Sequence, residues 1–338
     1  MSLLRRIAPQ LIALVILFAL VSAVFPGFLT VSLNDGRLVG PIIDVLKRGA
    51  PVALLSIGMT LVIATRGIDL SVGTTMAICG AAAAAAIAGG WGLPAALAIA
   101  LAAGAAAGLW NGVLVAIVGI QPFVATLILM TMGRGIAQLI TEGRILTFSD
   151  AGLAFFGSGT LLGLPVPAWL WIVGGLGVTL LMRRTALGLL IEAIGINRRA
   201  SALAGVNATV LLIAVYVAAG LCAALAGIVV TADIRGADAN NAGLWLELDA
   251  ILAVVIGGNS LLGGRFSVIA SLLGAMIIQT IDTGVLLAGF PPEYNLVIKA
   301  VLVLLILILQ SPRIAAEWRL WRDSQRAGRM AASERRPT

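Results

Sequence analysis

Apolar residues fill ten long runs of the chain, separated by short polar segments. A helix needs about 20 predominantly apolar residues to cross a bilayer, with ~17–25 workable. Strands of a membrane β-barrel would alternate apolar and polar residues, and these runs do not. The sequence therefore predicts an all-α membrane protein, a polytopic bundle of about ten transmembrane helices. The expected spans are 7–25, 50–65, 70–90, 93–118, 122–140, 165–182, 209–231, 249–263, 266–288 and 294–311. The run 249–263 is short enough for a re-entrant half-helix, which leaves the count open by one or two.

A polar break interrupts the pattern in IGMTLVIATRGIDLSVG, residues 57–73. Residues 50–90 read as one helix would be 41 residues long, so the chain must break or turn around residues 65–69. One interpretation is a tight surface loop, with Arg66 among lipid headgroups and Asp69 or Ser71 capping the next helix. The other is a discontinuous helix that lines an aqueous path. The sequence leaves both open.

A second break, GGNSLLGGR at residues 257–265, also lies between apolar runs. It is glycine-rich but lacks the Lys-Ser/Thr ending of a nucleotide-binding P-loop. We therefore do not expect this chain to hydrolyse ATP by itself.

Composition and charge agree with a membrane protein. Of the 338 residues, 60% are hydrophobic and 11% are charged, against about 25% charged in soluble domains. Basic clusters, which favour the cytoplasmic side, occur at Arg5 and Arg6, at residues 183–199, and in the tail 312–338. Six predicted spans precede the middle cluster and four follow it, so both termini are expected in the cytoplasm. The net charge of +7 fits contact with the inner leaflet better than nucleic-acid binding.

Lys47 and Arg48 fit this orientation less well, because parity places them on the outer side just before the second span. Interfacial anchoring is the only explanation that the sequence offers for this pair.

Polar residues inside the predicted spans are candidates for function, because charge in a bilayer is costly. They are Asn111, Gln121, Arg134, Gln138, Gln279 and Asp282. For Arg134 and Asp282 the alternative is snorkelling near a helix end, and for Asp282 this alternative is favoured. The chain has no histidine, which lowers the expectation of a proton relay. No metal-ligating or catalytic constellation appears, so we expect neither catalysis nor a metal in this chain, and Cys79 and Cys222 are expected to be small core residues.

Two segments outside the spans look suited to partners. The outer segment ADIRGADANN, residues 232–241, is a docking edge for a soluble protein or a solvated loop; its polar residues are Asp233, Arg235, Asp238, Asn240 and Asn241. The cytoplasmic segment 183–208 has apolar residues at helical spacing, with Glu192, Arg198 and Arg199 available on the other side. It predicts a short amphipathic helix that lies on the membrane or inserts into a groove of a partner.

Several of these motifs resemble a known family. EAIG at residues 192–195, followed by AGV at 204–206, is similar to the loop by which permeases of ABC importers dock onto their ATPase subunits. GMTLVIATRGIDLSVG at 58–73, PFVAT at 122–126 and ELDAILAVVIGG at 247–258 resemble the ribose/xylose/galactose permease family. Within it, residues 232–249 and LNDGRL at 33–38 look most like the galactofuranose permeases of enteric bacteria. One departure is Arg66, where many members carry a second glycine.

The resemblance implies a single permease domain over residues 1–338 with the fold of vitamin B12-type (type II) importer permeases, in a bacterial inner membrane. It implies a periplasmic sugar-binding protein at the outer face, and a second related permease as heterodimer partner, a homodimer being the alternative. It further implies an ATP-binding subunit that binds ATP and magnesium, with no cofactor in this chain.

The polar residues at the breaks and loops, taken together with this resemblance, lead us to expect roles for individual residues. The translocation path or gate is expected at Thr65, Gly67, Asp69, Ser71, Gly73, Asn111 and Arg134. ATPase coupling is expected within the loop 183–208, at Glu192, Ala193, Gly195, Asn197, Arg198 and Arg199. The binding protein would dock on the 232–241 segment.

Rival functions share parts of this pattern. A secondary sugar transporter driven by an ion gradient also has broken helices and polar residues at the midplane. An ABC permease for ribose, xylose or arabinose would have the same motifs. A membrane scaffold that transports nothing gives no reason for polar breaks at depth.

Overall fold

The computed structural model describes residues 3–34 and 36–310, and the predicted basic tail 312–338 lies outside the described residues. The helices are α1 (Leu3–Val24), α2 (Pro41–Arg48), α3 (Ala50–Ala64), α4 (Val72–Ala88), α5 (Leu93–Val113), the π-helix η1 (Leu114–Val118), α6 (Pro122–Thr141), α7 (Ala151–Ser158), α8 (Val166–Arg184), α9 (Leu187–Ile196), α10 (Arg198–Leu203), α11 (Ala208–Ile234), α12 (Leu246–Ile256), α13 (Val268–Leu287) and α14 (Pro292–Gln310). Each of the ten predicted spans overlaps at least one of these helices, but α12 ends at Ile256, seven residues before the end of the predicted span 249–263.

Length and hydropathy alone identify fewer crossings than the ten that were predicted. Within the described residues, six helices are long and apolar enough to span a membrane: α1, α5 continued by η1, α6, α8, α11 and α13. Helices α2 and α3 pass the same test only as a pair, bent by 44° at a one-residue break. Two further apolar helices lie at the centre: α4, with 17 residues, is at the lower limit for crossing a bilayer, and α12, with 11, is shorter than a bilayer requires.

Helix α11 forms the centre of the bundle. It has 27 residues and packs against α3, α4, α5 and α7. Small residues let the backbones approach closely: any Cβ at Gly104 would overlap the Gly220 carbonyl, and one at Gly58 would lie 2.6 Å from the Ala219 Cα. This packing through glycine and alanine is the expected mode for helices in a membrane, where lipid tails are as apolar as leucine.

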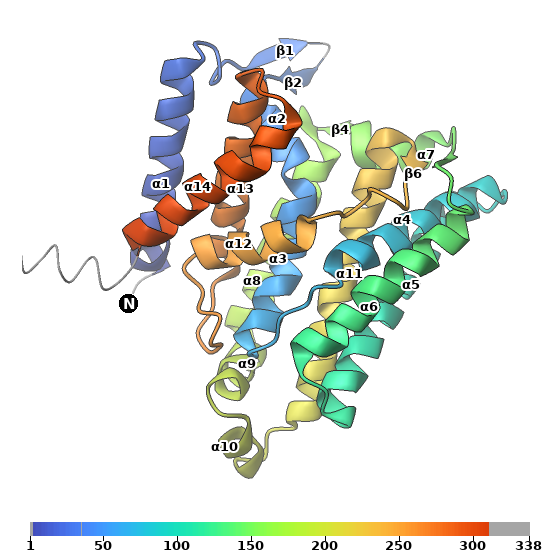
Figure 1. Ribbon diagram of the computed structural model, residues 1–338, viewed down its shortest axis with the longest axis vertical. Coiled ribbons are helices and arrows are strands. Elements are labelled where there is room, and N and C mark those ends of the chain that lie inside the picture. The colour runs from blue at the N-terminus through green and yellow to red at the C-terminus, as the bar shows by residue number, and fades with distance from the viewer. Residues whose placement is uncertain (1–2, 35, 311–338) are drawn as a thin grey trace, which may run out of the picture.

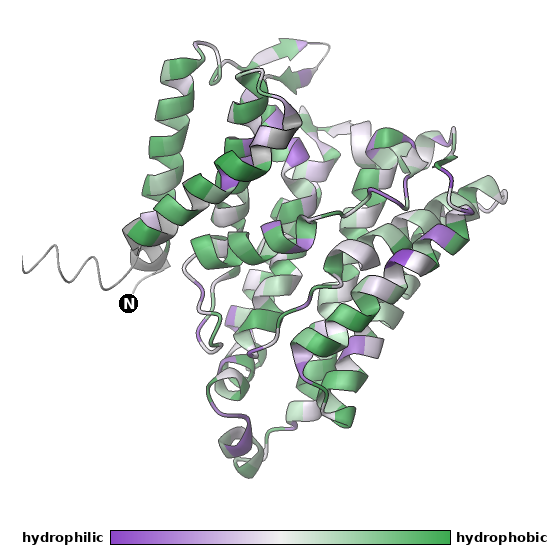
Figure 2. Ribbon diagram, in the orientation of Figure 1, coloured by the Kyte–Doolittle hydropathy of each residue, from purple (hydrophilic) through white to green (hydrophobic). Residues whose placement is uncertain are grey.

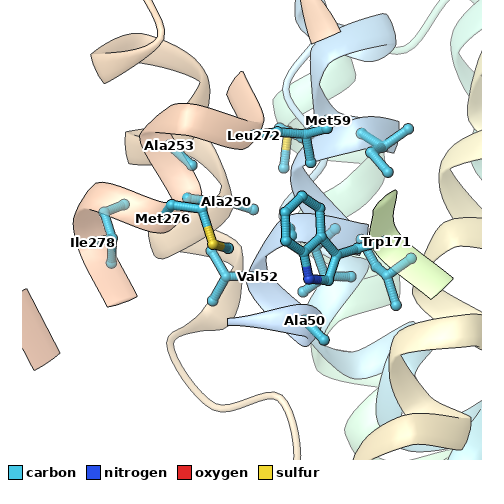
Figure 3. Packing of buried hydrophobic residues seen from close by; sticks show 14 of the residues in the cluster. Ala50, Val52, Met59, Trp171, Ala250, Ala253, Leu272, Met276 and Ile278 are labelled. Atoms are coloured by element: carbon cyan, nitrogen blue, oxygen red, sulfur yellow. The ribbon is translucent and has the colours of Figure 1, made fainter. Parts of the chain in front are cut away.

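A second packed region joins α3, α8, α12 and α13. Figure 3 shows Trp171 of α8 against residues of α3, with Met276 and Leu272 of α13 close by. The Trp171 indole N–H donates to the Leu46 carbonyl at 3.1 Å, which satisfies the one polar atom of this large side chain. Val72 and Met76 of α4 belong to the same buried cluster, so the helices on both sides of the break at residues 65–71 contribute to one apolar core.

Short strands and α7 lie at one end of the molecule, and α9 and α10 lie at the opposite end (Figure 1). The antiparallel pairs are β1 (Ser32–Asn34) with β2 (Arg37–Val39), β3 (Leu146–Thr147) with β6 (Gly236–Ala237), and β4 (Thr160–Leu161) with β5 (Leu164–Pro165). Figure 2 shows that the helices between these ends are mostly hydrophobic, while α10 combines a hydrophilic part with a hydrophobic one. The two segments predicted to meet partners are therefore at opposite ends.

Candidate functional site

The predicted break between α3 and α4 is present. Helix α3 ends at Ala64, Arg66 adopts the left-handed conformation with φ 65°, and α4 begins at Val72. The side chains of Thr65, Asp69 and Ser71 are buried inside the protein, whereas Arg66 is exposed. Ser71 occupies the position before α4, but its hydroxyl does not cap the helix. Burial of the polar segment within the protein favours the interpretation as a discontinuous helix over an open surface turn.

The polar side chains of this break form one hydrogen-bonded group, the Asp69 cluster, consisting of Asp69, Ser71 and Asn111. Asp69 Oδ1 accepts from the backbone N–H of Ser71 at 2.9 Å and from its hydroxyl at 2.6 Å. The Asn111 amide donates to the Ser71 hydroxyl oxygen at 2.8 Å and lies 3.5 Å from Asp69 Oδ1. These side chains are at most 3% exposed. The cluster holds a buried carboxylate with directed donors and links the break to α5.

Thr126 of α6 also binds the break, a role that the sequence did not reveal. Its hydroxyl accepts from the Leu70 N–H at 3.1 Å and lies 3.1 Å from the Ile68 carbonyl oxygen. Thr126 belongs to the PFVAT motif used for the family resemblance, but nothing in the sequence indicated which segment it touches. The break is thus held from α5 on one side and from α6 on the other.

Gly67 and Gly73 permit close contacts at the two ends of the break. A Cβ at Gly67 would lie 2.7 Å from the Tyr216 hydroxyl oxygen. A Cβ at Gly73 would overlap the Gly243 carbonyl oxygen and lie 2.5 Å from a carboxylate oxygen of Glu247. Gly73 therefore lets the start of α4 pack directly against the start of α12, where Glu247 is buried.

Arg134, predicted on the path, contacts a different part of the molecule. Its Nη1 donates to the carbonyls of Ala239 at 2.8 Å and Ala242 at 2.7 Å. One turn later, the Gln138 amide donates to the Asn240 side chain at 2.8 Å. Arg134 is eight residues beyond Thr126 on α6, about 12 Å along the axis. The structure thus places it with the predicted docking segment and away from the Asp69 cluster.

Residues of the predicted docking segment form an ordered, partly exposed surface. Asp233 accepts from Lys47 Nζ at 2.6 Å, which accounts for a lysine that the sequence left unexplained. Arg235 ends α11 in the left-handed conformation. Asp238 accepts from the backbone N–H groups of Asn240 and Asn241, and the Asn241 side-chain amide, above all, holds the pKa of Asp238 below its ordinary value.

The predicted coupling segment is two helices, α9 and α10, and the prediction of one amphipathic helix is wrong. Asn197 has φ −156° and ends α9, and its side chain caps α10 by accepting from the Ala200 N–H at 3.0 Å. An Asn in this extended conformation stops one helix and starts the next. Arg198 and Arg199 are exposed, whereas Ala193 and Glu192 are half-buried.

Glu192 borders a cavity of about 250 Å³, not a solvated polar face. Arg183, Leu189, Phe266 and Ser267 also line this cavity. Gly195 is buried against the Ala64 carbonyl at the end of α3. Exposed residues of the segment include the apolar Leu189, Ile196 and Leu203, the basic Arg198 and Arg199, and the polar Asn197.

A buried ion group of Lys299, Asp249 and Asp282 joins the last three helices. Lys299 Nζ of α14 lies 3.0 Å from Asp249 Oδ2 of α12 and 3.0 Å from Asp282 Oδ1 of α13. Asp282 therefore points to a cation within the bundle, not to a helix end as in snorkelling. Nothing in the sequence indicated that Asp249 and Lys299, 50 residues apart, would meet.

No group of three or more Cys, Asp or Glu residues close enough to hold a metal ion occurs within residues 3–34 and 36–310. The expectation that this chain carries no metal or cofactor is not tested by that observation.

Comparison with known proteins identifies the family. Residues 41–307 match the family described as branched-chain amino acid transport system / permease component. The galactofuranose transporter permease protein YtfT of Escherichia coli (strain K12) is 62% identical over 305 residues, covering 90% of this chain and 89% of that protein.

More distant relatives are permeases for other cargo. The fructose import permease protein FruF of Bifidobacterium longum (strain NCC 2705) is 42% identical, covering 88% of this chain and 86% of its own. The ribose import permease protein RbsC of Escherichia coli (strain K12) is 38% identical, covering 90% and 93%. No solved structure matches this chain significantly. These matches confirm the resemblance to sugar import permeases that the motifs predicted, and the chain belongs to the branched-chain amino acid transport system permease component family.

Proposed function

We propose that this chain is the membrane-spanning permease of an ATP-driven sugar importer in a bacterial inner membrane, and that its sugar is galactofuranose. The observation that carries the choice of sugar is the 62% identity to the galactofuranose permease over nine-tenths of both chains, well above the 42% and 38% to the fructose and ribose permeases. Both termini lie in the cytoplasm in this proposal, since the basic clusters fall on that side.

The fold that we propose has about ten crossings and the type II importer arrangement. Helices α2 and α3 count as one bent span among these, and the short helices α4 and α12 count as crossings that the non-helical segments beside them complete. Short helices of this kind occur in membranes where protein surrounds their ends or water reaches them. The burial of the α4 start against Gly243 and Glu247 supports this arrangement.

The sugar path in our proposal runs beside the break at residues 65–71. The Asp69 cluster is buried, and we expect it to gate this path by holding the backbone of the break in place. Asp69→Asn keeps an acceptor oxygen for Ser71 but removes the charge. We expect about tenfold slower uptake from this variant, ~1.4 kcal/mol on the transport barrier. Unchanged uptake in an assembled complex would exclude Asp69 from the path; Thr131→Val, on an exposed hydroxyl of α6, is the matched control.

Three partners complete the importer. An ATP-binding subunit, which holds ATP and magnesium, contacts the exposed apolar and basic residues of α9 and α10. A periplasmic sugar-binding protein contacts the segment around Asp233 and Asn241. A second, related permease lies beside this chain in a heterodimer. Residues 3–34 and 36–310 present exposed apolar side chains at both proposed surfaces, Leu203 at one and Trp245 at the other.

Uptake of labelled galactose tests the proposal. Cells that lack the gene are complemented with it, ion gradients are dissipated, and cytoplasmic ATP is maintained. With the parent gene, we expect uptake to continue under these conditions. With Glu192→Arg we expect uptake to fail, because a new cation in the Arg183-lined cavity would displace α9. Uptake that collapses with the gradients would indicate a secondary transporter. Absence of gene-dependent galactose uptake, with uptake of ribose, xylose or arabinose instead, would refute the sugar assignment.

A further inference from the structure

Three segments that are far apart in the sequence meet at the lower end of α3 in Figure 1: the break, the α9–α10 connection and the loop between α12 and α13. The Ala64 carbonyl accepts from the Gly264 N–H at 2.9 Å. A Cβ at Gly195 would overlap that same carbonyl oxygen and lie 2.6 Å from the Gly264 nitrogen. The end of α9 therefore rests directly on the hydrogen bond that joins α3 to the α12–α13 loop.

Arg66 joins the same three segments through its side chain. Its Nε donates to the Leu262 carbonyl at 2.8 Å, and its Nη2 donates to the Ile196 carbonyl at 2.8 Å. A guanidinium is rigid and planar, so two carbonyls bound to one guanidinium are held at a fixed separation. One residue of the break thereby fixes the end of α9 relative to the α12–α13 loop.

The α9–α10 connection also borders a cavity of about 270 Å³; Arg66, Ile194, Arg198 and Tyr216 are among its lining residues. Arg198 Nη2 donates to the Ala116 carbonyl at 3.1 Å, and Ile194 of α9 packs with Ala116 of η1 and Leu212 of α11. These contacts join α9 to η1 and α11, whereas Arg66 joins it to the break, so a displacement of α9 must act on the break.

We propose that Arg66 is a positioning residue that couples the α9–α10 connection to the break, so that movement imposed on α9 by a partner reaches Asp69, three residues from Arg66. The proposal rests on the proposed function in one respect: the partner that moves α9 is the ATPase. The Arg66 contacts lie within this single chain and need no partner. The positioning role of Arg66 can therefore be tested separately from the proposed function.

Arg66→Gly is the most informative variant. Glycine adopts the left-handed conformation of residue 66 without strain, so the substitution removes the side chain and leaves the backbone unchanged. Arg66→Lys keeps the charge but offers no planar fork for two carbonyls. Arg144→Ala is the matched control, because Arg144 forms an exposed ion pair with Glu142 on another part of the molecule.

The first measurement is the distance between spin labels at the exposed positions Leu189 of α9 and Leu262 of the loop. It uses the full chain in lipid, with Cys79 and Cys222 replaced by Ala. We expect a narrow distance distribution in the parent and in Arg144→Ala, a broad one in Arg66→Gly, and an intermediate one in Arg66→Lys. A distribution in Arg66→Gly as narrow as in the parent would overturn the proposal.

The second measurement is sugar transported per ATP hydrolysed by the complete complex in proteoliposomes. Arg66→Gly is expected to lower this ratio about fivefold or more, while leaving assembly and basal ATP hydrolysis in place, since coupling between sites is typically worth ~5–150-fold. An unchanged ratio would overturn the coupling role even if the distances broaden. If the parent complex shows no ATP-dependent transport, the proposed function fails, and the distance measurement still decides whether Arg66 fixes α9.

Discussion

Asn111 of α5 donates a hydrogen bond to the Ser71 hydroxyl at 2.8 Å, although the two residues are 40 positions apart in the chain. Ser71 in turn donates to Asp69 at 2.6 Å, so a helix of the bundle orients the carboxylate of the break. The polar residues of the break are therefore part of the packed interior, and its backbone geometry depends on α5.

Asn111→Ala tests this dependence. The change removes the donor to Ser71 and leaves buried oxygens without it, which costs about 1–3 kcal/mol for each unsatisfied group. We expect the free energy of unfolding in detergent to fall by about that amount. A variant as stable as the parent would show that the Asp69 cluster is held by the break alone.

Much of the architecture could be predicted from residue periodicity and length. The position of the break followed from the stretch 50–90, because its 41 residues are too many for one span. Helix α3 ends, and helix α4 begins, within a few residues of the expected limits. The glycine-rich loop at 257–265 lies between α12 and α13 as expected. Such features depend on local sequence, and a single sequence contains all of that information.

Contacts between distant segments could not be predicted. Periodicity marked Thr126 and Arg134 as part of one helix, but not that Thr126 binds the break while Arg134 binds residues 239–242. The pairing of Lys47 with Asp233 spans 186 positions. A single sequence carries no information on which of several polar residues will be neighbours, because that depends on how the helices pack.

Gly195→Ala tests the contact between α9 and α3. The added methyl group would overlap the Ala64 carbonyl, and overpacking of this kind costs about 1–3 kcal/mol. We expect lower thermal stability and weaker assembly with the ATPase. Gly177→Ala on α8 is the matched control, because no atom lies within 4 Å of the new Cβ; stability should be unchanged or higher. Equal behaviour of the two variants would contradict the close contact.

Lys299→Met tests the buried ion group. The change removes the Lys299 charge that lies 3.0 Å from a carboxylate oxygen of both Asp249 and Asp282, and breaking a buried pair typically costs about 3–5 kcal/mol. The thermal midpoint of the purified permease should fall strongly. Lys299→Arg, which retains the charge, should lose less. No difference between the Met and Arg variants would show that charge at this position does not hold α12 to α14.

Exchange of Lys47 and Asp233 distinguishes a role of this ion pair in the stability of the permease from a role in docking of the binding protein. Each single reversal, Lys47→Asp or Asp233→Lys, should lower stability by about 0.2–1 kcal/mol, as expected of a partly exposed ion pair, and the double reversal should restore it. If the binding protein contacts Asp233, the restored double variant still loses stimulation of ATP hydrolysis by the loaded binding protein. Full stimulation in the double variant would exclude the pair from the docking surface.

The central claim is that this chain conducts a sugar inward with ATP as the energy source. Its most direct test is accumulation of labelled galactose in proteoliposomes that contain the permease pair and ATPase, with binding protein outside, ATP inside and no ion gradient. We predict accumulation that requires hydrolysable ATP and the loaded binding protein. Accumulation that requires an imposed ion gradient and proceeds without ATP would contradict the claim.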